Sequence, residues 1–354
     1  MLEALPDKTM SNSTGPTGEQ RTSFDSAKLN RVLAKIPWKC LWVAQRVMAG
    51  NRIGQWIWKR VFPESGRRSA TVSMLCRSLK LTPVASHREL LRVYPNTLAE
   101  VVLYQMTRMT DEQTAARFRV FGRDVLDREL AAKRPVMLLG SHFGVNRILP
   151  FWIARQGIPL VSIEWKDKLR ALGLDFGQFL RVLEVEGGFA ARATLEAQRW
   201  LRGGGLVHMT GDNLRQYIQR SREFQWLGFR FTLPMGFARL AVQTNATVIP
   251  YFCQFDSQGV VEIRFHSPLQ FPPESDSEPP GTPAEREARL IERFFEVLTG
   301  EIERSPGNNY LPWERITTFA AAREKSMHSA NRGPGRKKRD SGTVDDKSQS
   351  AGPE

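Results

Sequence analysis

His142 is the residue in this sequence that is best placed to act as a general base. It follows the apolar run 136–140 within the stretch LLGSHFGVNRILPFW, and catalytic residues of open α/β sheets gather just beyond the carboxyl ends of the strands. Gly144 permits a sharp turn there, which would leave the imidazole facing solvent or substrate. A histidine base needs a carboxylate to orient its ring, but five positions later stands Arg147, a cation. If His142 carries chemistry, its partner must come from elsewhere in the chain.

The other four histidines fit structural roles better. His208 lies inside an apolar run and His328 lies in the polar C-terminal segment. For His87 and His266 we also prefer a structural interpretation, because a lone histidine is most often a hydrogen-bonded part of the framework. His142 is therefore the single candidate base.

Five short apolar or β-branched runs after Pro135 predict a sheet. They are VMLLG (136–140), PLVSI (159–163), GLVHM (205–209), ATVIPYF (246–252) and VVEIRF (260–265). Helical stretches separate most of them, and this alternation is typical of an α/β fold with a mixed, largely parallel sheet flanked by helices. A charged amphipathic helix over 281–305 would close the domain.

Residues 31–70 combine positive charge with tryptophan. The segment holds nine Lys or Arg residues against one acid, Glu64, and four of the nine tryptophans of the chain, with apolar residues at helical spacing. Helices that rest in a lipid headgroup region share this composition. Two interpretations stay open with equal weight: helices on a membrane surface, or a pair of helices packed on the domain behind, with their charges in solvent. Residues 87–130 are predicted to continue as helix.

Composition restricts the partners and the compartment. A net charge of +14 and a pI near 10.1 imply attraction to a polyanion, which is nucleic acid, an anionic membrane surface or an acidic protein. Cys40, Cys76 and Cys253 lie far apart, which argues against a disulfide framework or a zinc site and favours a reducing, cytosolic setting. We find neither a secretory signal pattern nor a stretch near the roughly 18 apolar residues of a membrane-spanning helix.

Four regions are predicted along the chain. Residues 1–30 form a flexible leader, 31–130 a basic amphipathic helical region, 131–318 the α/β domain and 319–354 a disordered basic tail. No internal repeat is evident. The oligomeric state stays open.

Other chemical signals are weak. The stretch 215–231 is rich in arginine, Arg230 included, with interleaved aromatics, and in principle such a stretch stacks on single-stranded nucleic acid. Its position favours a segment that faces substrate or membrane, so we do not expect a nucleic-acid partner. The glycines of 186–188 and 202–206 lack the spacing of a phosphate-binding loop, and no G-x-S-x-G elbow supports an α/β-hydrolase. No His/Cys/Asp cluster has metal-ligand spacing, so we expect neither a metal nor a cofactor.

Four segments carry a resemblance to a known family. They are GSHFG (140–144), LRGGGLVHMTGDN (201–213), FQWLGFRFTLPMGFARLAVQTNATVIPYF (224–252) and YLPWERI (310–316). In this order they resemble the lysophospholipid acyltransferase superfamily, specifically its bacterial lipid A biosynthesis lauroyl/myristoyl acyltransferase branch. The resemblance covers roughly residues 130–315, about half of the chain.

The resemblance implies a function. Members of the family move a fatty acyl chain from acyl carrier protein or coenzyme A to a hydroxyl of a lipid acceptor at the cytoplasmic face of the inner membrane. Carried over, His142 is the general base, and Asp212 with the loop to Gly228 helps to form the substrate cleft, with Gly144 and Arg230 as further substrate-binding candidates. The resemblance thus predicts a peripheral protein that uses a thioester donor and contacts anionic lipid.

The sequence departs from the family at Arg147, where members carry the acid of a His-x-x-x-x-Asp/Glu motif. A guanidinium beside the ring would oppose the imidazolium that the reaction creates. Three accounts remain: Asp212 or Glu164, each near a predicted strand end, replaces the acid while Arg147 grips a phosphate; His142 works alone; or the chain binds lipid without turnover. We rank transfer through an altered pair first and the non-catalytic role second.

Overall fold

The computed structural model describes residues 26–164, 177–185, 190–212, 221–269 and 281–310. A seven-stranded sheet in the order β1-β9-β8-β2-β5-β3-β4 forms its centre. All neighbouring strands run parallel except β8 and β9, so the predicted mixed, largely parallel sheet is confirmed. The strands are β1 (Phe118–Phe121), β2 (Val136–Gly140), β3 (Leu160–Glu164), β4 (Leu180–Glu184), β5 (Leu206–Thr210), β8 (Thr247–Phe255) and β9 (Val261–Phe265).

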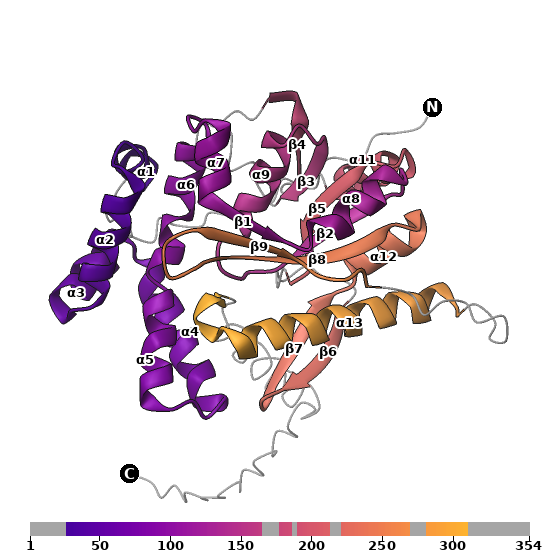
Figure 1. Ribbon diagram of the computed structural model, residues 1–354. Helices are drawn as coiled ribbons and strands as arrows, with labels where there is room; N and C mark the ends of the chain where they lie inside the picture. Colours follow the sequence, from indigo (N-terminus) through magenta and orange to yellow (C-terminus); the bar gives the residue numbers. More distant parts are fainter. Residues whose placement is uncertain (1–25, 165–176, 186–189, 213–220, 270–280, 311–354) are drawn as a thin grey trace, which may run out of the picture.

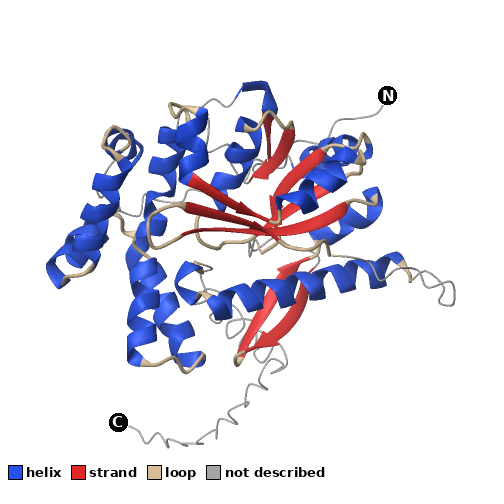
Figure 2. Ribbon diagram, viewed as in Figure 1, coloured by secondary structure: helices blue, strands red, loops and turns tan. Residues whose placement is uncertain are grey.

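Helices cover both faces of this sheet (Figures 1 and 2). On one face lie α6, α8 and α9, whose apolar residues pack with Leu138 and Ile249; on the other lie α11, α12 and α13, which pack with Met137 and Val248. Consecutive residues of a strand point to opposite faces, so a central strand covered on both faces must be apolar throughout. In β2 all five residues are buried.

The helices of the first half are α1 (Ser26–Leu33), α2 (Trp38–Ala49), α3 (Arg52–Val61), α4 (Glu64–Ser78), α5 (Pro83–Arg92), η1 (Pro95–Leu98), α6 (Ala99–Met106), α7 (Asp111–Arg117), α8 (Arg123–Ala131), η2 (Asn146–Ile148) and α9 (Leu149–Arg155). Those of the second half are η3 (Gly177–Phe179), α11 (Ala190–Arg202), α12 (Gly236–Thr244), α13 (Pro283–Arg304) and η5 (Pro306–Asn308). Among these described helices, none is both long and apolar enough to cross a membrane.

The structure corrects two expectations about secondary structure. Residues 87–130 are not continuous helix, because Phe118–Phe121 form β1 and pair with β9 at the edge of the sheet. The run FRVF alternates apolar and polar residues, which suits a strand, but it is too short to stand out between two helices. The sequence prediction also missed β4 and the antiparallel ribbon of β6 (Ser221–Trp226) and β7 (Phe229–Pro234).

The basic N-terminal helices pack on the edge of the domain. Trp38 and Trp42 of α2 are buried against Phe255, with ring centroids 5.5 and 5.4 Å away, and the Trp38 indole N–H donates to the carbonyl of Gly259 at 2.9 Å. The helices therefore contact the domain behind, as the second interpretation of this segment requires. These helices also expose apolar side chains, among them Val47 and Trp56.

His208 is a buried structural histidine in β5, as its place in an apolar run indicates. Its Nδ1 lies 2.7 Å from the Ser162 hydroxyl and its Nε2 lies 2.6 Å from the Tyr251 hydroxyl. Burial lowers the pKa of His208 to about 3, so the ring stays neutral near neutral pH.

This buried ring predicts a loss of stability on acidification. Between about pH 6.5 and pH 3 the unfolded chain protonates this residue and the folded chain does not, so the free energy of unfolding falls as pH falls, by about 1.4 kcal/mol per pH unit. Urea unfolding of wild type and of His208→Gln between about pH 6.5 and 4.5 measures this slope. The variant is expected to be less stable at pH 7 but to show a shallower slope, and equal slopes would contradict a neutral buried His208.

Candidate active site

The pairing of β2 with β5 brings His142 next to Asp212. The two strands run parallel, and their last residues, Gly140 and Thr210, are register partners. His142 and Asp212 each follow two residues later. The carboxyl ends of neighbouring parallel strands lie at the same edge of a sheet, so these two side chains meet there.

The Asp212 carboxylate binds His142 at two points. Its Oδ1 lies 2.8 Å from the ring Nδ1, and its Oδ2 accepts the backbone N–H of His142 at 2.6 Å. The carboxylate is fully buried, whereas about a third of the His142 side chain is exposed. A carboxylate only accepts hydrogen bonds, so it favours the tautomer with the proton on Nδ1 and leaves a lone pair on Nε2. Nε2 has no hydrogen-bond partner within the described residues, and this is the arrangement that a general base requires.

Gly144 allows the turn that presents His142. Its φ is +55°, and a Cβ at this position would lie 1.9 Å from the carbonyl oxygen of Cys253. Its N–H donates to the carbonyl of Asn308 at 2.6 Å, and the next N–H, of Val145, donates to Cys253 at 2.8 Å. We expected Gly144 to bind substrate. Its N–H is already paired with Asn308, so the described contacts give Gly144 a role in the shape of the turn.

Tyr310 is a neighbour of His142 that sequence reasoning missed. Its backbone N–H donates to the carbonyl of His142 at 3.0 Å, and the two rings meet edge to face with centroids 5.5 Å apart. Burial raises the pKa of Tyr310 against the opposing field of Arg147 and Arg68, so the hydroxyl is protonated and donates to the Asn146 side chain. The sequence placed Tyr310 at the start of the segment 310–316, and the rest of that segment lies outside the described residues.

Arg147 forms an ion pair away from the imidazole. Its Nη1 lies 3.6 Å from Oε1 of Glu100 on α6, and its side chain is 43% exposed. Burial lowers the pKa of Arg147, but the acidic groups around it, Tyr310 once it ionises and Glu100, raise this pKa by more. The guanidinium is therefore a compensated cation, and an anion that bound it would compete with Glu100.

Glu164, the other candidate acid, lies too far along the sheet. It ends β3, and β5 stands between β3 and β2 in the sheet. Adjacent strands are about 4.8 Å apart, so two strand spacings separate Glu164 from the end of β2. Its carboxylate accepts the Ser162 hydroxyl at 2.8 Å and lies 3.8 Å from Nδ1 of His208. The described contacts thus give the place beside His142 to Asp212.

Gly228 lies at the tip of the β6–β7 ribbon. Leu227 and Gly228 both have positive φ, as a two-residue hairpin turn requires. The described contacts of this ribbon go to α13, where Phe224 stacks on Phe295 with centroids 4.4 Å apart. Arg230 lies on β7, but its side chain falls outside the described part of the chain, as do residues 213–220 between Asp212 and the ribbon.

The chain is similar to known acyltransferases. The model of the bacterial lipid A biosynthesis acyltransferase family matches residues 87–296, more than half of the chain. The phosphatidylinositol mannoside acyltransferase of Mycobacterium tuberculosis is 27% identical to this chain over 143 residues. That match covers 39% of this chain and 44% of the relative, so the chain spans less than half the length of this relative.

The turn at Gly144 can be tested by adding one methyl group. Gly144→Ala combines a positive φ with a clash against the carbonyl of Cys253, so we expect it to lower the free energy of unfolding by about 2–5 kcal/mol. Gly157→Ala is the matched control, because Gly157 has φ +73° but open space around its Cβ position; it should cost only about 1–2 kcal/mol. Chemical denaturation of both variants measures the difference, and equal losses would mean that Cys253 does not constrain the turn.

Proposed function

Because the chain belongs to the bacterial lipid A biosynthesis acyltransferase family, we propose that it transfers a fatty acyl group from a thioester to a hydroxyl or amine of a lipid-like acceptor. The donor is an acyl thioester of acyl carrier protein or of coenzyme A. The reaction takes place at the cytoplasmic face of the inner membrane. The observation that carries this proposal is the contact between His142 and the buried carboxylate of Asp212.

In the proposed mechanism Nε2 of His142 removes the proton of the acceptor hydroxyl. The oxygen attacks the thioester carbonyl, and a tetrahedral intermediate forms. Its collapse breaks the carbon–sulfur bond. The imidazolium of His142 returns the proton to the leaving sulfur, so the carrier leaves as a thiol. Asp212 stabilises the imidazolium between these steps and keeps the ring in one orientation.

The contact of Asp212 with His142 supports an altered pair despite Arg147. In this proposal the carboxylate after β5 takes the role that the family motif gives to residue 147, and the cation at 147 pairs with Glu100. A lipid-binding protein without turnover would need no carboxylate on Nδ1. This contact therefore favours catalysis over the non-catalytic alternative.

The outer face of α1–α3 supports docking on an anionic bilayer. Seven large apolar side chains of α1–α3 and of the α1–α2 junction are exposed: Val32, Ile36, Val43, Val47, Ile53, Trp56 and Ile57. The same helices carry many cations, among them Lys39, Arg52 and Lys59, and this combination suits a surface of apolar chains and negative headgroups. The following helix, α4, places the Arg68 guanidinium 4.4 Å from the centre of the Tyr310 ring, beside His142. Docking through α3 would thus hold the site near the lipid.

The catalytic proposal is tested by three single variants. His142→Ala and Asp212→Asn should each reduce acyl transfer by about 100- to 10,000-fold, because the base or its orientation is lost. Glu164→Gln is the control, a change of carboxylate to amide at the neighbouring strand end, and should keep activity within about threefold of wild type. The assay uses radiolabelled acyl-carrier and acyl-coenzyme A donors with mixed lipid acceptors, and circular dichroism checks folding. A wild type that transfers from neither donor, or a Glu164→Gln loss as large as that of Asp212→Asn, would contradict the proposal.

The docking face is tested by two double variants. Ile53→Asp/Trp56→Asp places charge on the outer face of α3 and should weaken co-sedimentation with phosphatidylglycerol vesicles by about tenfold or more. Val84→Asp/Leu195→Asp makes the same change at exposed apolar residues of α5 and α11 and should have little effect. Wild-type binding should also weaken as salt rises. If both double variants lose binding equally, general charge rather than this face determines it.

A further inference from the structure

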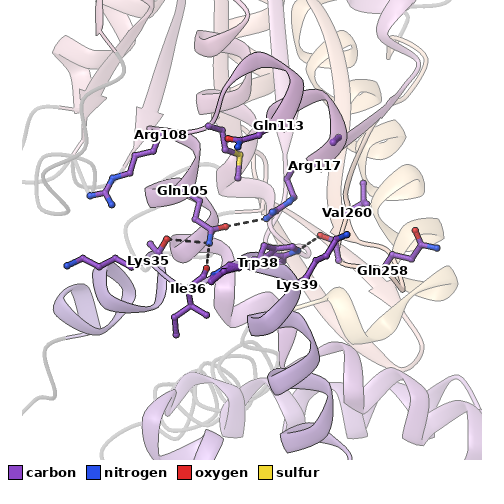
Figure 3. A pocket seen from close by; sticks show the side chains of 15 residues that line it. Lys35, Ile36, Trp38, Lys39, Gln105, Arg108, Gln113, Arg117, Gln258 and Val260 are labelled. Atoms are coloured by element: carbon purple, nitrogen blue, oxygen red, sulfur yellow. Dashed lines mark hydrogen bonds between the residues drawn. The ribbon is translucent and has the colours of Figure 1, made fainter.

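A pocket of about 610 Å³ lies at the N-terminal side of the molecule, apart from His142 (Figure 3). Three parts of the chain form it: the junction of α1 with α2, the helices α6 and α7, and the turn between β8 and β9. The C-terminal end of β8 and the N-terminal end of β1 lie here, at the same edge of the sheet as His142 but one and three strands away from β2.

The pocket is lined by four cations and no acid. Lys35, Lys39, Arg108 and Arg117 contribute to its wall, together with three glutamines. Within the described residues none of the four forms an ion pair. Asp256, the acid nearest in sequence to the turn, accepts the backbone N–H groups of Gln258 and Val260 and pairs with Arg119 outside the pocket. The positive charge of the pocket is therefore left without a counter-charge.

The end of the Arg117 side chain lies near Gln105 and Trp38 in this pocket (Figure 3). Its guanidinium carbon is 4.5 Å from the centroid of the Trp38 ring, and its Nη1 donates to Oε1 of Gln105 at 3.3 Å. A guanidinium has five N–H donors, so most of them remain for a ligand. Burial lowers the pKa of Arg117 to about 10, since no neighbouring carboxylate compensates for it.

Hydrogen bonds hold the walls in place. The amide of Gln105 donates to the carbonyl of Ile36 at 3.1 Å, and this fixes the α1–α2 junction to α6. The Trp38 N–H holds the β8–β9 turn through Gly259, whose φ of +84° brings its backbone against Trp38 and Trp42. The walls of the pocket beside Arg117 are thus braced by hydrogen bonds.

We propose that this pocket is a binding site for a phosphate ester, separate from the acyl-transfer site. A phosphate monoester carries about −1.5 to −2 charge, which suits a pocket lined by four cations and no acid, and the guanidinium of Arg117 can bind it through paired N–H donors. The volume exceeds that of a phosphate alone, so the pocket also accommodates the group that carries it. Ile36 belongs both to this pocket and to the exposed apolar face of α1–α3, and so a lipid headgroup at the bilayer surface would reach the pocket.

Binding is measured on the full chain, without any acyl-transfer assay, so the result is independent of the function proposed for His142. The probes are glycerol 3-phosphate, by calorimetry, and phosphatidylcholine vesicles with and without phosphatidate, by co-sedimentation. Arg108→Gln/Arg117→Gln removes two pocket cations, and Arg128→Gln/Arg293→Gln removes two exposed cations of α8 and α13, which gives the same change in net charge. Lys35→Gln/Lys39→Gln is a second pocket variant at exposed positions, for the case in which loss of Arg117 impairs folding.

The pocket variants should weaken binding of at least one probe by tenfold or more, and the matched surface variant by less than threefold. If the pocket variants bind both probes more weakly than wild type, a soluble phosphate ester is enough for binding. If they bind only the phosphatidate vesicles more weakly, the ligand is the lipid headgroup. The proposal is overturned if wild type binds neither probe. It is also overturned if the surface variant loses as much affinity as the pocket variants do.

Discussion

The register between β2 and β5 is the constraint on which the candidate site depends. Because Gly140 pairs with Thr210, the residues that follow each strand emerge at the same level, and Asp212 reaches both the ring and the backbone N–H of His142. A shift of one residue would turn the side chains of a strand to the opposite face of the sheet. The apolar residues of both strands are buried on both faces, so their packing fixes this register firmly.

The closing segment after α13 completes the site by holding the turn from outside. Asn308 accepts the Gly144 N–H through its carbonyl, and Tyr310 holds the carbonyl of His142 and covers one edge of its ring. Asn308 is itself braced, because its side-chain amide donates to Gln254 at 2.7 Å and accepts from Asn96 at 3.1 Å. Segments far apart in sequence therefore fix the orientation of one imidazole, as a preorganised base requires.

The sequence predicted the sheet and singled out His142 as a candidate base, but it did not decide which acid lies beside His142. The central strands carry near-continuous apolar runs, and His142 after one of them was recognisable for that reason. Asp212 and Glu164 looked equivalent, since both follow such runs and only the order of the strands separates them. That order depends on how crossover helices pack, which one chain's periodicity does not reveal. Tyr310 was missed for a related reason: its contact with His142 comes from a tertiary approach with no local sequence pattern.

Cations that form ion pairs and cations that do not lie in different parts of this chain, whose net charge is +14. This separation bears on how His142 could act beside Arg147. Two arginines that flank Tyr310 each lie beside an acid: Arg147 with Glu100 at 3.6 Å, and Arg68 with Glu64 at 3.0 Å. Other cations lie on α1–α3 and line the pocket around Arg117, which does not include His142. An uncompensated guanidinium beside the ring would disfavour the imidazolium, whereas the same charge at a distance attracts an anionic substrate or surface. The substitution of arginine at position 147 is thus compatible with a histidine base because Glu100 balances it and Asp212 supplies the negative charge at the ring.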